Sequence, residues 1–215
     1  MAERPAFIPG ARLHLLTPAY DRLFGLFLPA AELRDGIVER LGLPTGARVL
    51  DLACGTGALL GRFAALRPDL DLLGLDIDPA MIARAGERSR RAGARVKLIT
   101  ANADRVPLPD ASLDAVVSVL AFHHLPPPIK RGAAAEIRRL LKPGGSVLIA
   151  DFGPPLDRVQ AALFAVAGRL ESAVTTAGHA DGVVGVLLRE QGFDVAETGR
   201  MRTIFGSVAF YQATA

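Results

Sequence analysis

The sequence predicts an α/β fold in which a mostly parallel sheet is covered by helices on both faces. Short apolar runs alternate with stretches of helical periodicity from about residue 47 to residue 151, which is typical of consecutive strand–helix–strand units. The first apolar run ends in a glycine-rich turn that opens a helix. After residue 151, two helical stretches precede two β-rich runs, which predict an antiparallel hairpin at the C-terminal end.

The central elements follow one another closely. We expect helices at Ala58–Leu66, Pro79–Ala92 and Ile129–Leu141, with a short or irregular piece around Asp104–Ala111. Pro79 suits a first helical turn, because its missing N–H would have no partner there, and Asp78 before it is a typical N-cap. The strands are expected at Ala47–Leu52, Leu70–Asp76, Arg95–Thr100, Leu113–Val119 and Ser146–Asp151.

The flanking segments are predicted to be mainly helical. Residues from about Ala11 to Leu43 have helical periodicity and are split by Pro29, which indicates an N-terminal helical cap. Beyond residue 151 we expect helices at Leu156–Thr176 and Asp181–Gln191, then strands at Asp194–Met201 and Ile204–Gln212. The expected sheet therefore has seven strands.

Composition favours one globular domain without a membrane span. The chain has 215 residues, half of them hydrophobic, and a net charge of +3 that gives little support to nucleic-acid binding. Cys54 is the only cysteine, which excludes an intrachain disulfide and suits a reducing cytoplasm. Neither a signal peptide nor an apolar run of about 18 residues is visible. Five arginines, which we interpret as a solvated helix face, are Arg84, Arg88, Arg90, Arg91 and Arg95.

The turn after the first strand predicts a cofactor site. In Asp51-Leu-Ala-Cys-Gly-Thr-Gly57, the glycines allow bare backbone to approach a ligand at a helix N-terminus, although such a turn also simply joins a strand to a helix. Asp76 ends the second strand, where an acid can accept hydrogen bonds from both hydroxyls of a ribose. Together they predict an adenosine-containing cofactor.

Two classes of cofactor fit these residues. The spacing of Gly55, Gly57 and Gly61 also resembles a dinucleotide fingerprint, so a nicotinamide-dependent oxidoreductase is an alternative. Three further segments distinguish between the two classes. Together with the terminal hairpin, they have the order and spacing of class I methyltransferase motifs. These segments are residues 101–110, 112–118 and 140–148.

The chain thus resembles the class I S-adenosylmethionine-dependent methyltransferase superfamily, and within it the ubiquinone/menaquinone biosynthesis C-methyltransferase type. The resemblance covers about Arg48 to Phe152. It implies a Rossmann-like, mostly parallel seven-stranded sheet with an antiparallel C-terminal strand. It also implies S-adenosylmethionine as the cofactor, with S-adenosylhomocysteine as its product. The motifs are specific for cofactor and fold but only weakly specific for the methyl acceptor.

The resemblance also assigns cofactor-binding residues. Asp51, Ala53 and the backbone of Gly55, Thr56 and Gly57 would surround the methionine part, with Asp76 on the ribose and Ile77 against the adenine. Asn102 and Ala103 would meet the adenine edge, with Asp104 as a reserve candidate, since many relatives have Asp where Asn102 stands. Carbonyls from Ser118 to Leu120 would meet the ammonium group. Tyr20 would close over the cofactor from the helical cap, unless the Tyr20-Asp21 pair serves only to cap a helix.

His123 and His124 follow the fourth strand, where the donated methyl group is expected to point. One of them is a candidate general base or could orient an acceptor hydroxyl. The alternative is a packing role, because in-line transfer from a sulfonium can need only proximity and alignment. We expect no metal site, because the four histidines show no i, i+4 pairing and no carboxylate cluster joins them.

The predicted activity is methyl transfer to a small hydrophobic or aromatic acceptor, with O-, C- and N-methylation all open. A cofactor-binding scaffold or regulator is the alternative, and an NAD(P)-dependent oxidoreductase is less favoured. We expect a cytoplasmic monomer or homodimer of one domain, divided into a cap (1–46), a cofactor-binding core (47–152) and an acceptor-side part (153–215). The expected lining of the acceptor pocket is Phe27, Phe122, Phe152, Leu163, Phe164 and Ala167.

Overall fold

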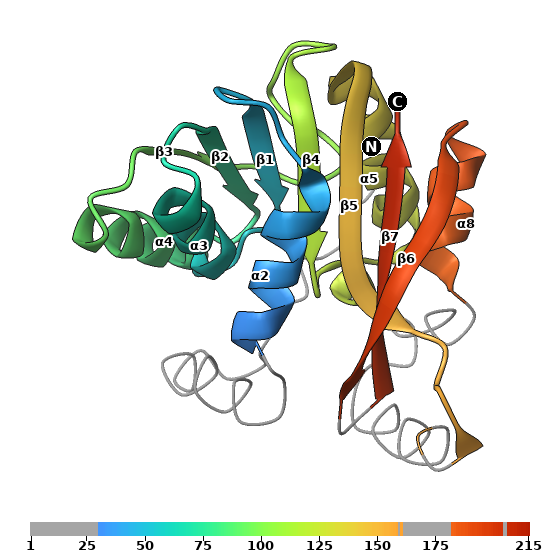
Figure 1. Ribbon diagram of the computed structural model, residues 1–215. Coiled ribbons are helices and arrows are strands. Elements are labelled where there is room, and N and C mark those ends of the chain that lie inside the picture. The colour runs from blue at the N-terminus through green and yellow to red at the C-terminus, as the bar shows by residue number, and fades with distance from the viewer. Residues whose placement is uncertain (1–29, 159, 161–181, 204–205) are drawn as a thin grey trace.

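The structure is a computed structural model that describes residues 30–158, 160, 182–203 and 206–215. Its centre is a seven-stranded sheet of order β3-β2-β1-β4-β5-β7-β6, with helices on both faces (Figure 1). Strand β7 runs antiparallel to both of its neighbours, and the other neighbouring pairs are parallel. The predicted fold class is confirmed.

Most predicted elements lie within two residues of their predicted bounds. The strands are β1 (Arg48–Leu52), β2 (Asp71–Asp76), β3 (Val96–Thr100), β4 (Leu113–Val119), β5 (Leu141–Gly153), β6 (Asp194–Thr203) and β7 (Gly206–Thr214). The described helices are α2 (Ala30–Leu41), α3 (Ala58–Leu66), α4 (Pro79–Arg91), the short 3-10 helix η2 (Phe122–His124), α5 (Pro127–Leu140) and α8 (Val183–Glu190). The piece around Asp104–Ala111 contains turns and no helix.

Strand β5 is longer than predicted. We expected it to begin at Ser146, because Pro143-Gly144-Gly145 is typical of a turn, but it begins at Leu141. Leu141 pairs with Leu113, and the register between β4 and β5 shifts between Leu113 and Ala115. This irregularity lets the strand take up its extra residues without losing its pairing with β4.

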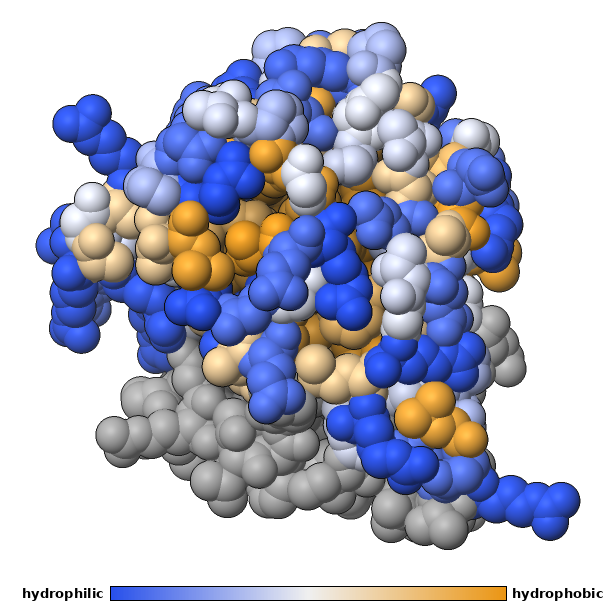
Figure 2. Space-filling model, viewed as in Figure 1, coloured by the Kyte–Doolittle hydropathy of each residue, from blue (hydrophilic) through white to orange (hydrophobic). Residues whose placement is uncertain are grey.

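The sheet is buried on both faces, which explains why its central strands are almost continuously apolar. On one face Leu50 and Leu52 pack with Ile137 of α5 and Leu188 of α8. On the other face Val49 packs with residues of α2 and α3, among them Ile37, Leu60 and Phe63. On the side shown in Figure 2 the outer surface is mainly hydrophilic, with small apolar groups between the polar ones.

Several predictions about the flanking segments lie outside the described residues. They include the part of the helical cap before residue 30, most of the helix expected at Leu156–Thr176, and Asp181. Within the ranges given above, no helix is long and apolar enough to cross a membrane.

Gly74 allows α3 and β3 to pack closely over β2. A Cβ at this position would lie 2.6 Å from Leu60 Cδ1, 2.9 Å from Leu98 Cδ2 and 3.0 Å from Cys54 Sγ. We therefore expect Gly74→Ala to lower the free energy of unfolding by about 1 to 3 kcal/mol through overpacking, measured by urea denaturation. Gly86→Ala in α4 is the matched control, because its Cβ would meet Leu98 Cδ1 at an ordinary 3.5 Å. It should be neutral or stabilising by up to about 1 kcal/mol, and an equal loss in both variants would contradict the packing argument.

Candidate active site

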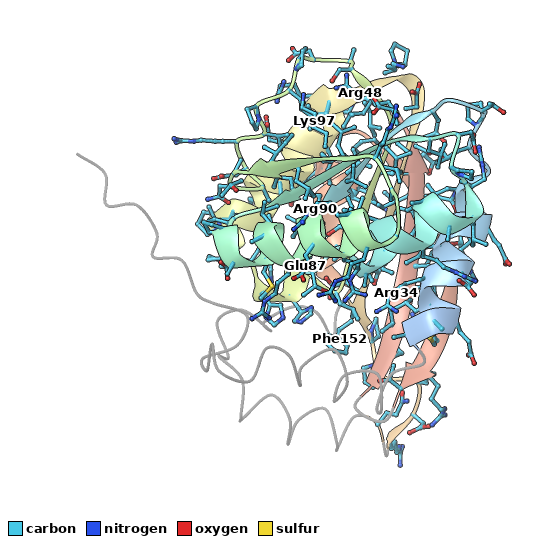
Figure 3. All side chains as sticks on the ribbon, turned by 90° about the vertical axis from the view of Figure 1, so that its left-hand side faces the viewer. Arg34, Arg48, Glu87, Arg90, Lys97 and Phe152 are labelled. Atoms are coloured by element: carbon cyan, nitrogen blue, oxygen red, sulfur yellow. The ribbon has the colours of Figure 1, made fainter. Side chains whose placement is uncertain are left out.

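The candidate site lies at the carboxyl ends of the parallel strands, where β1 and β4 are neighbours. The chain leaves β1 toward the face covered by α3 and leaves β4 toward the face covered by α5, and ligands of open α/β sheets bind at such a divergence. Phe152 near the end of β5 lies at this end of the molecule, whereas Arg48 and Lys97 near the starts of β1 and β3 lie at the other (Figure 3). The fold thus gathers the segments that follow β1, β2, β3 and β4.

The loop after β1 is tightly turned. Ala53, Gly55 and Gly57 have positive φ angles of 61°, 52° and 72°, a conformation that costs little only for glycine. The Cys54 N–H donates to the carbonyl oxygen of Leu75 at 2.9 Å, which ties the loop to β2. A Cβ at Gly57 would lie 2.9 Å from the Ala85 Cβ, so glycine also permits contact with α4.

Arg88 has a structural role beyond the solvated face predicted for the arginines of α4. Its side chain is exposed, but its Nε donates to the Thr56 carbonyl oxygen at 3.0 Å. The same guanidinium reaches Thr56 Oγ1 at 3.4 Å. The loop after β1 is therefore held from α4 as well as from β2.

Asp76 connects three elements of the site. Its carboxylate accepts hydrogen bonds from the Gly55 N–H at 2.8 Å and from the Asp78 N–H at 2.9 Å. Burial raises the pKa of this carboxyl, and these two backbone bonds oppose the shift. Asp78 is the N-cap of α4, accepting from the Ala80 N–H at 2.8 Å, as the sequence predicted.

Asp51 is a second buried acid beside Asp76. Its side chain belongs to β1 and the residue is only 2 % exposed. Burial, with the negative charge of Asp76 adding to it, raises the pKa of Asp51 from 3.8 to about 7. A cationic ligand group near this pair would favour the ionised form of Asp51. The site is therefore suited to a positively charged ligand.

Cys54 is a packing residue, as predicted. It is buried within the glycine-rich loop and contributes to the core on the α3 face. Burial raises the pKa of its thiol, and the charges of Asp51 and Asp76 raise it further. The thiol therefore remains protonated and is not a nucleophile.

The segments after β2 and β3 lie at the same edge of the sheet. Ile77 is unusual for a large apolar residue in being 40 % exposed, directly after Asp76. Asn102 is half-buried, whereas the side chain of Ala103 packs into the core beside α5. Asp104 faces α5, because a Cβ at Gly132 would lie 2.5 Å from the Asp104 Cβ. Asp104 therefore packs closely against α5.

The end of β4 has its own constraints. Ser118 is buried and its Oγ donates to the Leu52 carbonyl oxygen at 2.8 Å, so the hydroxyl joins β4 to β1. Leu120 has a φ of 51° and its N–H donates to the Ala150 carbonyl oxygen at 2.8 Å. The chain therefore turns sharply after β4, and η2 begins two residues later with the histidines.

The two histidines differ in their surroundings. His123 is 3 % exposed, and its Nδ1 lies 2.8 Å from Oδ1 of Asp151, which is fully buried at the end of β5. His124 is half-buried, with its ring centroid 3.8 Å from that of His123. The sequence interpretation missed Asp151, although it is an acid near the end of an apolar strand, as Asp51 and Asp76 are.

Some predicted site residues lie outside the described ranges. Tyr20 is one of them, and so are four expected members of the acceptor pocket: Phe27, Leu163, Phe164 and Ala167. Among the residues that the structure does describe, no group of three or more His, Cys, Asp or Glu side chains is placed to hold a metal ion.

Comparison with known proteins agrees with this geometry. Residues 49–145 match the methyltransferase domain family. Demethylmenaquinone methyltransferase from Thermus thermophilus is 33 % identical over 65 % of this chain and 64 % of its own length. The ubiquinone/menaquinone biosynthesis C-methyltransferase UbiE from Syntrophotalea carbinolica is 30 % identical over 69 % and 63 %, respectively. The chain thus spans somewhat less than two thirds of the length of these curated relatives.

Solved structures show the same fold. A SAM-dependent methyltransferase from Aquifex aeolicus superposes with a TM-score of 0.65 at 20 % identity, covering 85 % of this chain and 89 % of its own. Magnesium protoporphyrin IX methyltransferase from Synechocystis, solved with bound SAH, gives 0.68 at 20 % identity, covering 85 % and 82 %. Residues 49–145 are therefore similar to methyltransferase domains, and the predicted resemblance to the class I S-adenosylmethionine-dependent methyltransferases is confirmed.

Proposed function

We propose that this protein transfers a methyl group from S-adenosylmethionine to a small hydrophobic or aromatic acceptor and releases S-adenosylhomocysteine. The observation that carries the proposal is the glycine-rich loop fixed to Asp76, beside the buried Asp51, at the point where β1 and β4 diverge. Such a site presents backbone N–H groups and two acids to an adenosyl ligand that bears positive charge.

The proposed cofactor roles come from the family resemblance, and the positions of the described residues are compatible with them. Asp76 would accept from the ribose hydroxyls through its remaining lone pairs, and the exposed face of Ile77 would cover the adenine. Asn102 and the backbone of Ala103 would meet the adenine edge. Asp51, with the backbone of Ala53, Gly55, Thr56 and Gly57, would surround the methionine part, and carbonyls from Ser118 to Leu120 would accept from its ammonium group. We also propose that Tyr20, from the N-terminal cap, contacts the cofactor.

The chemistry supplied by the cofactor is an activated methyl group on a sulfonium. The protein then contributes alignment, exclusion of water and, for some acceptors, removal of a proton. The acceptor would lie beyond β4 and β5, beside His123, His124 and Phe152. The name of a further relative agrees with a small organic acceptor. The chain is 34 % identical, over 56 % of its length, to 27-O-demethylrifamycin SV methyltransferase from Amycolatopsis mediterranei.

We extend the proposal to the whole chain, in which residues 1–215 would form a single cytoplasmic domain. The protein would act as a monomer or homodimer and would bind no nucleic acid. A scaffold with this fold is the second candidate, because one fold hosts many functions. It would bind the cofactor without turnover.

The deciding experiment is calorimetric titration with S-adenosylmethionine, S-adenosylhomocysteine and NADPH in parallel, followed by assay of S-adenosylhomocysteine release with quinol, phenol and amine acceptors. Micromolar binding of both adenosyl ligands and turnover of an acceptor supports the proposal. Binding of NADPH alone would overturn it, and cofactor binding without turnover would favour the scaffold.

Asp76 should dominate cofactor affinity. We expect Asp76→Ala to weaken S-adenosylhomocysteine binding by about 10- to 100-fold, since it removes a charge-assisted acceptor and frees the Gly55 N–H. Asp78→Ala is the matched control. Loss of the N-cap should lower stability by about 1 kcal/mol and leave the affinity unchanged. Calorimetry on both folded variants gives the comparison, and equal affinities would refute the assignment of Asp76.

Asp51 should make the stability of the ligand-free protein depend on pH. Because its pKa is raised in the folded protein, the contribution of Asp51 to the free energy of unfolding is complete below pH 3.8. This contribution is lost as the pH rises through about 7. Asp51→Asn should therefore become progressively more stable than the wild type between pH 4 and 7, by up to on the order of 4 kcal/mol at about 1.4 kcal/mol per pH unit. Urea denaturation of both proteins across this range measures the difference.

Asp51→Asn should also bind S-adenosylmethionine more weakly than the wild type at pH 8, because the carboxylate attracts the cationic ligand. If the difference in free energy of unfolding between Asp51→Asn and the wild type does not change with pH, the pKa of Asp51 is not raised in the folded protein.

A further inference from the structure

The loop of residues 104–111, between β3 and β4, is held by two side chains of α5. It contains turns and no helix, so its backbone groups need partners other than regular secondary structure. The Val106 N–H donates to Glu136 Oε2 at 2.7 Å, and the Val106 carbonyl oxygen accepts from Arg139 Nη2 at 2.9 Å. Both backbone groups of Val106 are therefore bound by α5, as they would be by a neighbouring strand.

Arg139 uses its whole guanidinium in these contacts. An arginine side chain has five N–H donors, and Nε donates to Glu136 Oε1 at 2.7 Å. One terminal nitrogen, Nη1, donates to the Leu108 carbonyl oxygen at 2.8 Å and to Asp110 Oδ1 at 2.6 Å. The other, Nη2, donates to Glu136 Oε2 at 2.7 Å as well as to Val106. The five donors thus meet five acceptors, and three of these acceptors belong to the loop.

The two α5 side chains are charged and partly shielded from water. The side chain of Glu136 is 16 % exposed and that of Arg139 is 30 % exposed. The hydrogen bond from Arg139 lowers the pKa of Glu136, and the bonds to Glu136 and Asp110 raise the pKa of Arg139. Both groups therefore keep their charges at neutral pH, where hydrogen bonds to ionised groups are stronger than those between neutral groups.

Packing holds the loop against the same helix. The side chains of Val106 and Leu108 are buried in the core on the α5 face of the sheet. Gly132 lets the start of the loop approach α5, because a Cβ there would lie 2.5 Å from the Asp104 Cβ. The loop is thus fixed to α5 by apolar contacts as well as by the charged pair.

The proposed adenine-side residues come just before the held part of the loop. Asn102 and Ala103 follow β3, and the Ala101 N–H donates to the Asp76 carbonyl oxygen at 3.1 Å. After them, the Arg105 N–H donates to the Asn102 carbonyl oxygen at 3.0 Å, and the segment bound by α5 follows at once. The position of Asn102 and Ala103 therefore depends on β2 on one side and on α5 on the other.

We propose that Glu136 and Arg139 are positioning residues for adenine recognition. They hold the loop so that the Ala103 N–H stays at the hydrogen-bonding edge of the base, which lets the site distinguish a 6-amino purine from a 6-oxo purine. The proposal rests on the proposed methyltransferase function, because the adenine is that of the cofactor. Neither side chain is proposed to contact the cofactor, since both act through the loop.

The two kinds of purine present opposite hydrogen-bonding patterns at this edge. Adenine has a donor at its 6-amino group and an acceptor at N1, whereas hypoxanthine has an acceptor and a donor there. Asn102 can turn its amide to match either base, but the backbone N–H of Ala103 can only donate. Discrimination therefore depends on how firmly that N–H is held, because a loop that yields can avoid leaving it unpaired against the wrong base.

The test compares S-adenosylhomocysteine with S-inosylhomocysteine, which differ only at this edge, by calorimetric titration of the full-length protein. We expect the wild type to bind the adenosyl ligand at least about 100-fold more tightly. Arg139→Met keeps an apolar stem but removes all the donors, and it should reduce this ratio by about tenfold or more. Arg139→Lys should behave similarly, because a lysine ammonium cannot form the same fork of hydrogen bonds.

Arg138→Met is the matched control. Arg138 is the neighbouring residue of α5, and its exposed guanidinium lies 5.2 Å from the centroid of the Phe193 ring. Its replacement should leave the ratio of affinities unchanged. A purely structural role of Arg139 would lower stability or weaken both ligands equally, so an unchanged ratio in Arg139→Met would refute the proposal. Binding of neither ligand by the wild type would instead refute the proposed methyltransferase function.

Hydrogen exchange of backbone amides gives a second test, which does not depend on the folding of the Arg139 variants. Glu136→Ala leaves the Val106 N–H without its acceptor, whereas the amide oxygen of Glu136→Gln can still accept it. In the complex with S-adenosylhomocysteine, the Val106 and Ala103 amides should exchange at least about tenfold faster in Glu136→Ala than in the wild type. Glu136→Gln should lie between the two. Equal exchange of the Ala103 amide in all three proteins would show that α5 does not position it, and would overturn the proposal.

Discussion

The carboxylate of Asp76 fixes the relative positions of the loop after β1, the end of β2 and the start of α4. It does so with two hydrogen bonds, to the N–H groups of Gly55 and Asp78. The loop can reach this carboxylate only because its backbone adopts positive φ angles and because Gly57 has no Cβ to meet Ala85. The geometry of the whole cofactor half of the site therefore depends on a side chain that is itself a proposed ligand contact.

This arrangement has a cost in stability. Asp51 and Asp76 are both buried, and burial raises the pKa of each carboxyl. The negative charge of Asp76 raises the pKa of Asp51 further. A protein selected for stability alone would replace Asp51 with an uncharged residue of similar size. Retaining two acids is reasonable if the ligand brings the compensating charge, which S-adenosylmethionine does at its sulfonium and ammonium groups. The free protein is then less stable than its complex.

The sequence predicted the cofactor half of the site well because its signals are local. Asp51, Gly55 and Gly57 stand within one turn, and Asp76 ends the next strand along the chain, so strand and helix periodicity suffices to place them. The early start of β5 was missed because Pro143-Gly144-Gly145 favours a turn locally, whereas pairing of Leu141 with Leu113 is a tertiary contact.

The acceptor half depends on non-local pairing. His123 and Asp151 are 28 residues apart and meet because β4 and β5 are neighbours with Ser118 opposite Ile149. Burial of Lys130 in the first turn of α5 contradicts the usual preference of lysine for the surface, and the charge of Asp151 raises the pKa of its ammonium group against the effect of burial. Sequence reasoning found the histidines but had no means of telling which of them a carboxylate would hold.

The two halves of the site solve opposite electrostatic problems. Near Asp51 the chain leaves negative charge for a cationic ligand to balance, whereas near Asp151 the chain supplies its own cation in Lys130.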